Sequence, residues 1–215
     1  MDNKETGRLE AFSDGVIAVA ITLLILNIKI PGVDSLGKQD LWSALGGEWS
    51  SLVAYVTSFA TIGIIWLNHH RLFVHIKRTN TVLLLLNLLL LLIIVFIPVP
   101  TALLAEYFVK ADQNAAAIVY SGTFFMLACS FNLLWRYASY HNRLLSKDAD
   151  PGAVAAISRQ YFFGPLLYIV SFGLAWVNTP ASVILNFALA LFFALPSPPL
   201  RRLPSSEAST GLSQD

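Results

Sequence analysis

Charged residues are scarce in this chain of 215 residues. Only 13% of the residues are Asp, Glu, Lys or Arg, whereas 56% are hydrophobic, and the mean hydropathy is +0.64. A water-soluble domain of this size has too little interior to hide so much apolar surface. The composition therefore excludes an ordinary soluble domain and indicates an integral membrane protein.

Several chemical signatures are also missing. Cys129 is the one cysteine, so no intramolecular disulfide framework is available. The apolar segments hold no nucleophile with a base, no glycine-rich phosphate loop and no metal-ligand pair, and the chain has no TVGYG filter. The net charge of +1 gives no indication of a nucleic-acid partner. We expect no enzymatic activity, no cofactor and no resident metal.

Ionisable residues are almost absent from the interior of the apolar segments. Transporters coupled to protons or sodium usually keep an ionisable or densely polar site near the midplane, often on a broken helix. Pro98, Pro100 and Pro165 could break helices, but no carboxylate accompanies them. The pattern therefore argues against coupled transport.

Long apolar segments dominate what is present. Crossing about 30 Å of hydrocarbon takes roughly 20 residues, and six windows qualify. They lie near residues 11–30, 50–72, 80–104, 114–138, 160–177 and 181–200. We predict an all-α integral membrane protein with six transmembrane helices per subunit, although a single long segment in place of the last two would change the topology.

The chain divides into one domain and a tail. Residues 1–200 are expected to form the six-helix transmembrane domain, and the Pro- and Ser-rich residues 201–215 a disordered cytoplasmic tail. The first apolar run is too long for a signal-peptide core, so we expect it to be retained. The connection over residues 31–49 is expected to contain one short interfacial helix, and residues 141–160 a solvated loop.

The basic residues predict the orientation of the helices, because lysine and arginine accumulate on the cytoplasmic side. Three of the 14 fall on one side: Lys29, Lys38 and Lys110. The remainder fall on the other side: Lys4, Arg8, Arg71, Lys77, Arg78, Arg136, Arg143, Lys147, Arg159, Arg201 and Arg202. We therefore expect a multi-pass protein of the cell membrane with both termini in the cytoplasm.

The first apolar segment has one face with a distinct composition. At about 100° per residue, one arc of roughly 100° collects Gly15, Val19, Thr22, Leu23, Leu26 and Ile30. Symmetric copies of this stripe around an axis would make a narrow, largely dry pore with one polar ring, which can gate by dewetting. Ordinary helix packing, with Thr22 bonded to the carbonyl four residues back, explains the same pattern.

Polar residues precede this segment. Ser13 and Asp14 suit an N-cap and first turn, because a serine side chain and a negative charge both favour a helix N-terminus. Capping does not account for Arg8 and Glu10, and Arg8 needs a bend or a third partner to meet Asp14. The charged cluster therefore predicts a contact with another part of the chain.

A candidate partner ends the second apolar segment. Trp66 lies three and four residues before His69 and His70, so these side chains share a helix face. The two histidines are either ordinary interfacial residues or members of a hydrogen-bonded cluster with the start of the first segment. His69, His70 and His75 make a poor metal site, because adjacent histidines diverge and no acidic or thiol ligand is near.

Three stretches together carry a family resemblance. "RLEAFSDG" at 8–15, "SFATIGIIWLNHHRLF" at 58–73 and "NTVLLLLNLLLLLIIVFIPVPTALL" at 80–104 resemble the bacterial branch of the endolysosomal potassium channel family, the transmembrane protein 175 family. The resemblance implies a six-helix subunit whose first helix lines a central pore without a carbonyl filter. It also implies that a single-repeat chain assembles as a homotetramer in the lipid bilayer and passes potassium ions.

The resemblance also assigns residues to roles. It implies a pore with hydrophobic constrictions and a threonine layer, carried by Val19, Thr22 and Leu26, with Leu23 at the shoulder. The polar network that it implies is structural and comprises Arg8, Ser13, Asp14, Trp66, His69 and His70. Val19 is smaller than the isoleucine or leucine often found at the constriction, which implies a wider neck.

These observations predict a potassium-preferring cation channel with passive permeation. A secondary transporter of an ion or small solute is the first alternative, and its polar face would be lined by Asn68, Asn87, Ser121, Ser130 and Asn132. A membrane scaffold without a transport role is the second. Assembly state separates them, because one first helix cannot enclose a pore.

Overall fold

The described part of the chain is helical. The computed structural model describes residues 2–28, 40–47, 49–108, 110–146 and 149–195. Its α-helices are α1 (Asp2–Leu23), α3 (Leu41–Gly47), α4 (Trp49–His75), α5 (Thr81–Phe96), α6 (Pro98–Tyr107), α7 (Gln113–Ser139), α8 (Pro151–Leu174) and α9 (Thr179–Ala194), with short 3-10 turns η1 (Leu24–Asn27) and η2 (Tyr140–Asn142). The predicted all-α class is confirmed.

Five helical stretches are long and apolar enough to cross a membrane. They are Glu5–Leu26, Ser51–His75, Thr81–Tyr107, Gln113–Asn142 and Pro151–Leu174. The protein is therefore a multi-pass membrane protein. The sixth apolar window corresponds to α9, which has 16 residues and is about 24 Å long.

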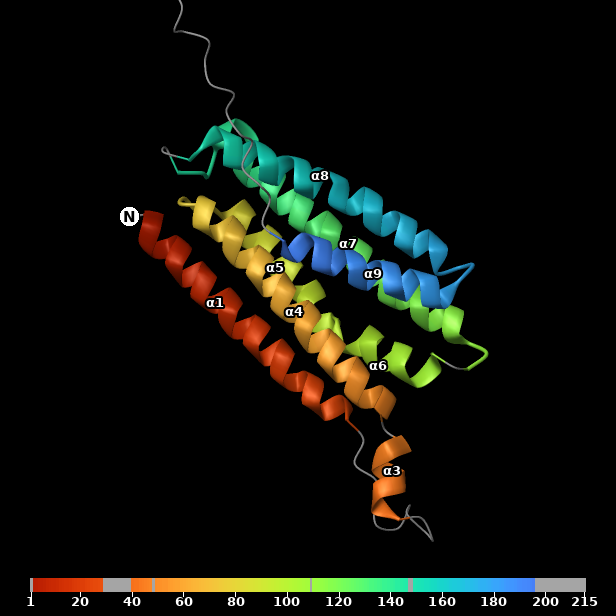
Figure 1. Ribbon diagram of the computed structural model, residues 1–215. Coiled ribbons are helices and arrows are strands. Elements are labelled where there is room, and N and C mark those ends of the chain that lie inside the picture. The colour runs from red at the N-terminus through yellow and green to blue at the C-terminus, as the bar shows by residue number, and fades with distance from the viewer. Residues whose placement is uncertain (1, 29–39, 48, 109, 147–148, 196–215) are drawn as a thin grey trace, which may run out of the picture.

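Helices α1 and α4 lie side by side, with α1 at one edge of the bundle and α8 at the opposite edge (Figure 1). Helix α1 packs against α4 and α5, whereas α7 contacts α5, α6, α8 and α9 and forms the centre. Among the described residues, only one side of α1 has neighbours, so its other side is left uncovered.

The first helix begins earlier than the sequence predicted. Ser13 and Asp14 lie in the middle of α1, which starts at Asp2, so their assignment as N-cap and first-turn residues is wrong. The Ser13 hydroxyl instead donates to the carbonyl of Leu9, 2.8 Å away, one turn back in the same helix. The preference of Ser and Asp for a helix start is overridden here, because the polar residues of this turn have partners on neighbouring helices.

Prolines act differently in two helices. The third apolar window is divided at Ile97 into α5 and α6, and Pro98 and Pro100 follow directly, as predicted. Pro165 does not break α8. Pro165 has no N–H for the Tyr161 carbonyl, and the Asn132 amide of α7 donates to that carbonyl instead.

Two connections were predicted with mixed success. The short helix expected within residues 31–49 is present as α3. The loop over 141–160 is not simply solvated, because α8 already starts at Pro151 and Leu144 and Leu145 are buried. The Leu144 carbonyl accepts from the backbone N–H of Lys77, which fastens this loop to the end of α4. The predicted tail, residues 201–215, lies outside the described residues.

Candidate functional site

Helix α1 has two contrasting faces. The face packed against the rest of the chain carries the buried residues Thr6, Leu9, Ser13, Ile17 and Ala20, and Leu24 of η1 continues it. The opposite face carries the predicted stripe, with Val19 56% and Leu26 74% exposed and Gly15 and Leu23 exposed as well. Ile30, the last member of the stripe, lies outside the described residues. The stripe therefore faces away from its own subunit.

Thr22 stands at the centre of the uncovered face. Its hydroxyl donates to the carbonyl of Val19, 2.9 Å away and three residues back, where the sequence suggested a bond four residues back. A hydroxyl has one donor and two acceptor lone pairs. Because the hydrogen is used inside the helix, the exposed oxygen of Thr22 presents its lone pairs, which suit a cation.

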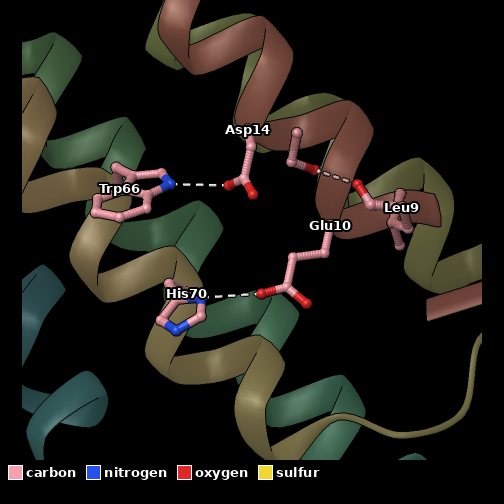
Figure 2. A network of polar contacts seen from close by, with 6 residues as sticks. Leu9, Glu10, Asp14, Trp66 and His70 are labelled. Atoms are coloured by element: carbon pink, nitrogen blue, oxygen red, sulfur yellow. Dashed lines mark hydrogen bonds and ion pairs between the residues drawn. The ribbon is translucent and has the colours of Figure 1, made fainter. Parts of the chain in front are cut away.

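Two exposed polar pairs join α1 to α4 (Figure 2). The indole N–H of Trp66 donates to Asp14 Oδ1 at 2.8 Å, and His70 Nδ1 lies 2.9 Å from Glu10 Oε1. The rings of Trp66 and His70 are stacked, with centroids 6.0 Å apart. The structure thus brings two acidic residues from the middle of α1, Glu10 and Asp14, against one face of α4.

A second, fully buried network joins three helices behind these two pairs. The Asn87 amide of α5 donates to the Ser13 hydroxyl of α1 at 2.8 Å, and its Oδ1 lies 2.9 Å from His69 Nε2 on α4. With the amide oriented in this way, His69 Nε2 must carry the hydrogen. His69, Asn87 and Ser13 are each 0% exposed, so a buried network fastens the inner face of α1 to α4 and α5.

Sequence reasoning missed two members of this arrangement. Asn87 was considered only as a transport residue, and Glu10 was given no partner. The signal for Asn87 was a lone amide in a leucine-rich helix, where an unsatisfied polar group is costly. Asn87 lies 74 residues from Ser13 and 18 residues from His69 in the sequence, so the sequence alone does not show that they are neighbours.

Arg8 and His75 stand apart from these networks. Arg8 is exposed on α1, and its guanidinium makes no hydrogen bond or ion pair with the described residues. His75, at the end of α4, packs its ring edge-on against Trp135, with centroids 6.2 Å apart. Within the described ranges, no group of three or more His, Cys, Asp or Glu side chains could hold a metal ion.

The geometry of the described residues centres on α1. This outer helix is held by hydrogen bonds and turns a stripe of apolar residues and one hydroxyl oxygen away from the rest of the bundle. Fold and site together define a multi-pass helical membrane protein in which α1 is held by polar networks on one side and is uncovered on the other.

Comparison with known proteins gives the family. A sequence model described as endosomal/lysosomal potassium channel TMEM175 matches residues 8–98, which include most of α1 and all of α4 and α5. A protein named potassium channel from Chamaesiphon minutus is 47% identical and covers 91% of this chain and 97% of its own length. A protein of the same name from Streptomyces collinus is 42% identical and covers 95% and 98%.

Solved structures agree with the sequence matches. The crystal structure of a lysosomal potassium-selective channel TMEM175 homolog from Chamaesiphon minutus superposes with a TM-score of 0.80 at 45% identity, covering 91% of this chain and 99% of that one. The chain belongs to the TMEM175 family.

Proposed function

We propose that this protein is a potassium-preferring cation channel of the cell membrane, formed by a homotetramer with passive permeation. In this assembly four α1 helices surround the central axis. The uncovered stripe of α1 is the observation that carries the proposal, because it is turned outward while the opposite face is buried. The names of the relatives from Chamaesiphon minutus and Streptomyces collinus support potassium as the permeant ion.

The side chains of the stripe suggest how such a pore would work. Val19 and Leu26 would form apolar rings on either side of Thr22, with Leu23 at the shoulder. A narrow apolar ring empties of water readily and so can act as a gate. Between the rings, four Thr22 oxygens would provide a layer of acceptors for a partly dehydrated cation. No carbonyl filter of the TVGYG kind is needed in this design.

The topology that goes with this proposal has six crossings in one domain, residues 1–200, including the shorter α9. The N-terminal part of α1 and the connection from α4 to α5 lie at the same end of the bundle, where the Thr79 hydroxyl donates to Glu5 Oε2 at 3.2 Å. Arg8, Lys77 and Arg78 belong to this end. The accumulation of basic residues supports a cytoplasmic location for it and for both termini.

The transport alternative finds less support. Three of its candidate polar residues are used between helices: Asn87 holds Ser13 and His69, Ser121 bonds Ser182, and Asn132 bonds the Tyr161 carbonyl. Groups with protein partners of this kind stabilise helix packing. The proposal of a channel therefore stands without a second candidate.

The proposal is tested by assembly state and ion flux together. The purified protein should have the mass of four chains in detergent, and in liposomes with a potassium gradient it should pass potassium faster than sodium. A monomer, or a tetramer without detectable flux, would contradict the channel. Saturable flux coupled to a second solute would favour a transporter.

Thr22→Val is expected to weaken the preference for potassium over sodium while flux persists. Valine keeps the shape of threonine but removes the oxygen, and a hydrogen-bond-strength contact to a charge is worth about 1.5–3 kcal/mol, or roughly ten- to hundredfold in binding. Reversal potentials in a planar bilayer measure the ratio. Thr22→Ser, which keeps the oxygen, is the control. Equal ratios in all three proteins would remove Thr22 from the ion path.

Arg8→Ala is expected to reduce tetramer stability or the amount of protein in the membrane more than it changes ion preference. The guanidinium has no partner among the described residues of its own subunit, so any contact by which Arg8 stabilises α1 would be with a neighbouring subunit. The tetramer fraction after mild heating measures this effect, and reversal potentials measure preference. A changed preference with the tetramer intact would instead place Arg8 in the permeation path.

A further inference from the structure

Two adjoining cavities lie on the face of α4 opposite Trp66 and His70. The larger, about 310 Å³, lies between α4 and α8, and its lining includes Arg71, His75 and Gln160. The smaller, about 50 Å³, lies deeper between α4, α7, α8 and α9. Asn68 and Tyr161 line both cavities, so the two meet at these side chains.

The larger cavity is electropositive. Arg71 donates to the carbonyls of Phe193 and Ala194 at 3.4 and 2.7 Å, which satisfies the last turn of α9 but leaves the positive charge without a carboxylate partner among the described residues. A guanidinium has five N–H donors, so others remain for a ligand. No Asp or Glu is among the described residues that line either cavity. Lys77, two residues beyond His75, adds a further positive charge at this end of α4.

An unsatisfied polar group marks the junction of the cavities. Asn68 is half-buried, and its amide makes no hydrogen bond to any described residue. It lies one turn before Arg71 on α4, so both side chains can reach a single ligand. A phosphate group offers the acceptor oxygens that both require.

The smaller cavity has the opposite chemistry. Its lining is mostly apolar and aromatic, and includes Phe124, Phe131, Tyr168 and Phe193. From Asn68 it extends to Thr61, seven residues along α4, or about 10 Å. Because α4 is a membrane-spanning helix, this depth lies within the hydrocarbon region. The larger cavity therefore suits a charged headgroup, and the smaller cavity beyond it suits an apolar tail.

We propose that the two cavities bind an anionic phospholipid from the leaflet at this end of the bundle. Its phosphate contacts Arg71 and Asn68, and the upper part of an acyl chain enters the smaller cavity. A soluble anion would leave the smaller cavity unused. A choline headgroup would place a second positive charge beside Arg71 and Lys77. The site is independent of the proposed pore, because it lies on the other face of α4.

Lipid titration of the full chain in detergent, followed by native mass spectrometry, tests the site. Phosphatidylglycerol is expected to bind roughly tenfold more tightly than phosphatidylcholine, because both lipids offer a phosphate to Arg71 but only choline adds a positive charge beside it. Arg71→Gln should abolish this preference. Equal binding of the two lipids, or full displacement of phosphatidylglycerol by inorganic phosphate, would overturn the proposal.

A variant that keeps Arg71 separates lipid binding from the capping of α9. Ala153 lines the larger cavity, and Ala153→Trp should fill it and lower phosphatidylglycerol binding roughly tenfold with the Arg71 bonds intact. Ala155→Trp, two residues along α8 at an exposed position outside the lining, is the matched control and should bind lipid normally. Equal binding by both tryptophan variants would exclude the cavity as the site.

Discussion

Val19→Trp is expected to abolish potassium flux while the tetramer still forms. Val19 is 56% exposed on the uncovered face of α1, so the larger ring does not disturb packing inside the subunit. Around a four-fold axis, four indoles at this level would fill the neck of the pore. Potassium efflux from liposomes should fall to the level of liposomes without protein, and the mass of the assembly should be unchanged.

Val170→Trp is the matched control. Val170 is 60% exposed on α8, at the edge of the bundle opposite α1 (Figure 1), so the same change in size meets lipid there. Its flux should equal that of the unaltered protein. Full flux through an intact Val19→Trp tetramer would place the ion path somewhere other than the stripe of α1.

The membership of the stripe on α1 was predictable, because helical periodicity places its residues on one arc, but its exposure was not, because both arcs of the helix are apolar. A helix with neighbours on one side buries one arc and exposes the other, and Leu9, Ile17 and Leu24 mark the buried arc. The start of α1 was not predictable in the same way. Ser13 and Asp14 match the local pattern of a helix start, and only their partners on α4 and α5 show why the helix runs through them.

The buried network depended on tertiary information. The sequence places Trp66 and His70 on one face of a helix, and the structure brings that face to Asp14 and Glu10. The sequence does not indicate that Asn87, in a different helix, lies between Ser13 and His69. A lone amide among leucines predicts that a partner exists, but the choice of partner is made by the packing of three helices.

Asn87→Leu is expected to destabilise the subunit strongly. Leucine has a similar volume but removes the hydrogen bonds to Ser13 and His69 at a position that is 0% exposed. Nδ1 of His69 already lacks a partner among the described residues, so the whole imidazole would be left unsatisfied. Leaving buried polar groups unpaired costs about 1–3 kcal/mol each, so we expect a total of about 2–4 kcal/mol. Thermal unfolding in detergent should shift down by roughly 5–10 °C.

A double-mutant cycle distinguishes the hydrogen bond from a simple packing defect. His69→Phe keeps an aromatic ring beside Phe73, with which His69 now stacks at 4.4 Å between centroids, but leaves Asn87 Oδ1 without its donor. Replacing both residues removes donor and acceptor together, which is far less costly than orphaning one of them. The double variant should therefore be about 1–2 kcal/mol more stable than the sum of the single changes predicts. Strict additivity would mean that Asn87 and His69 stabilise the three-helix junction independently, and that α1 is not held through their mutual bond.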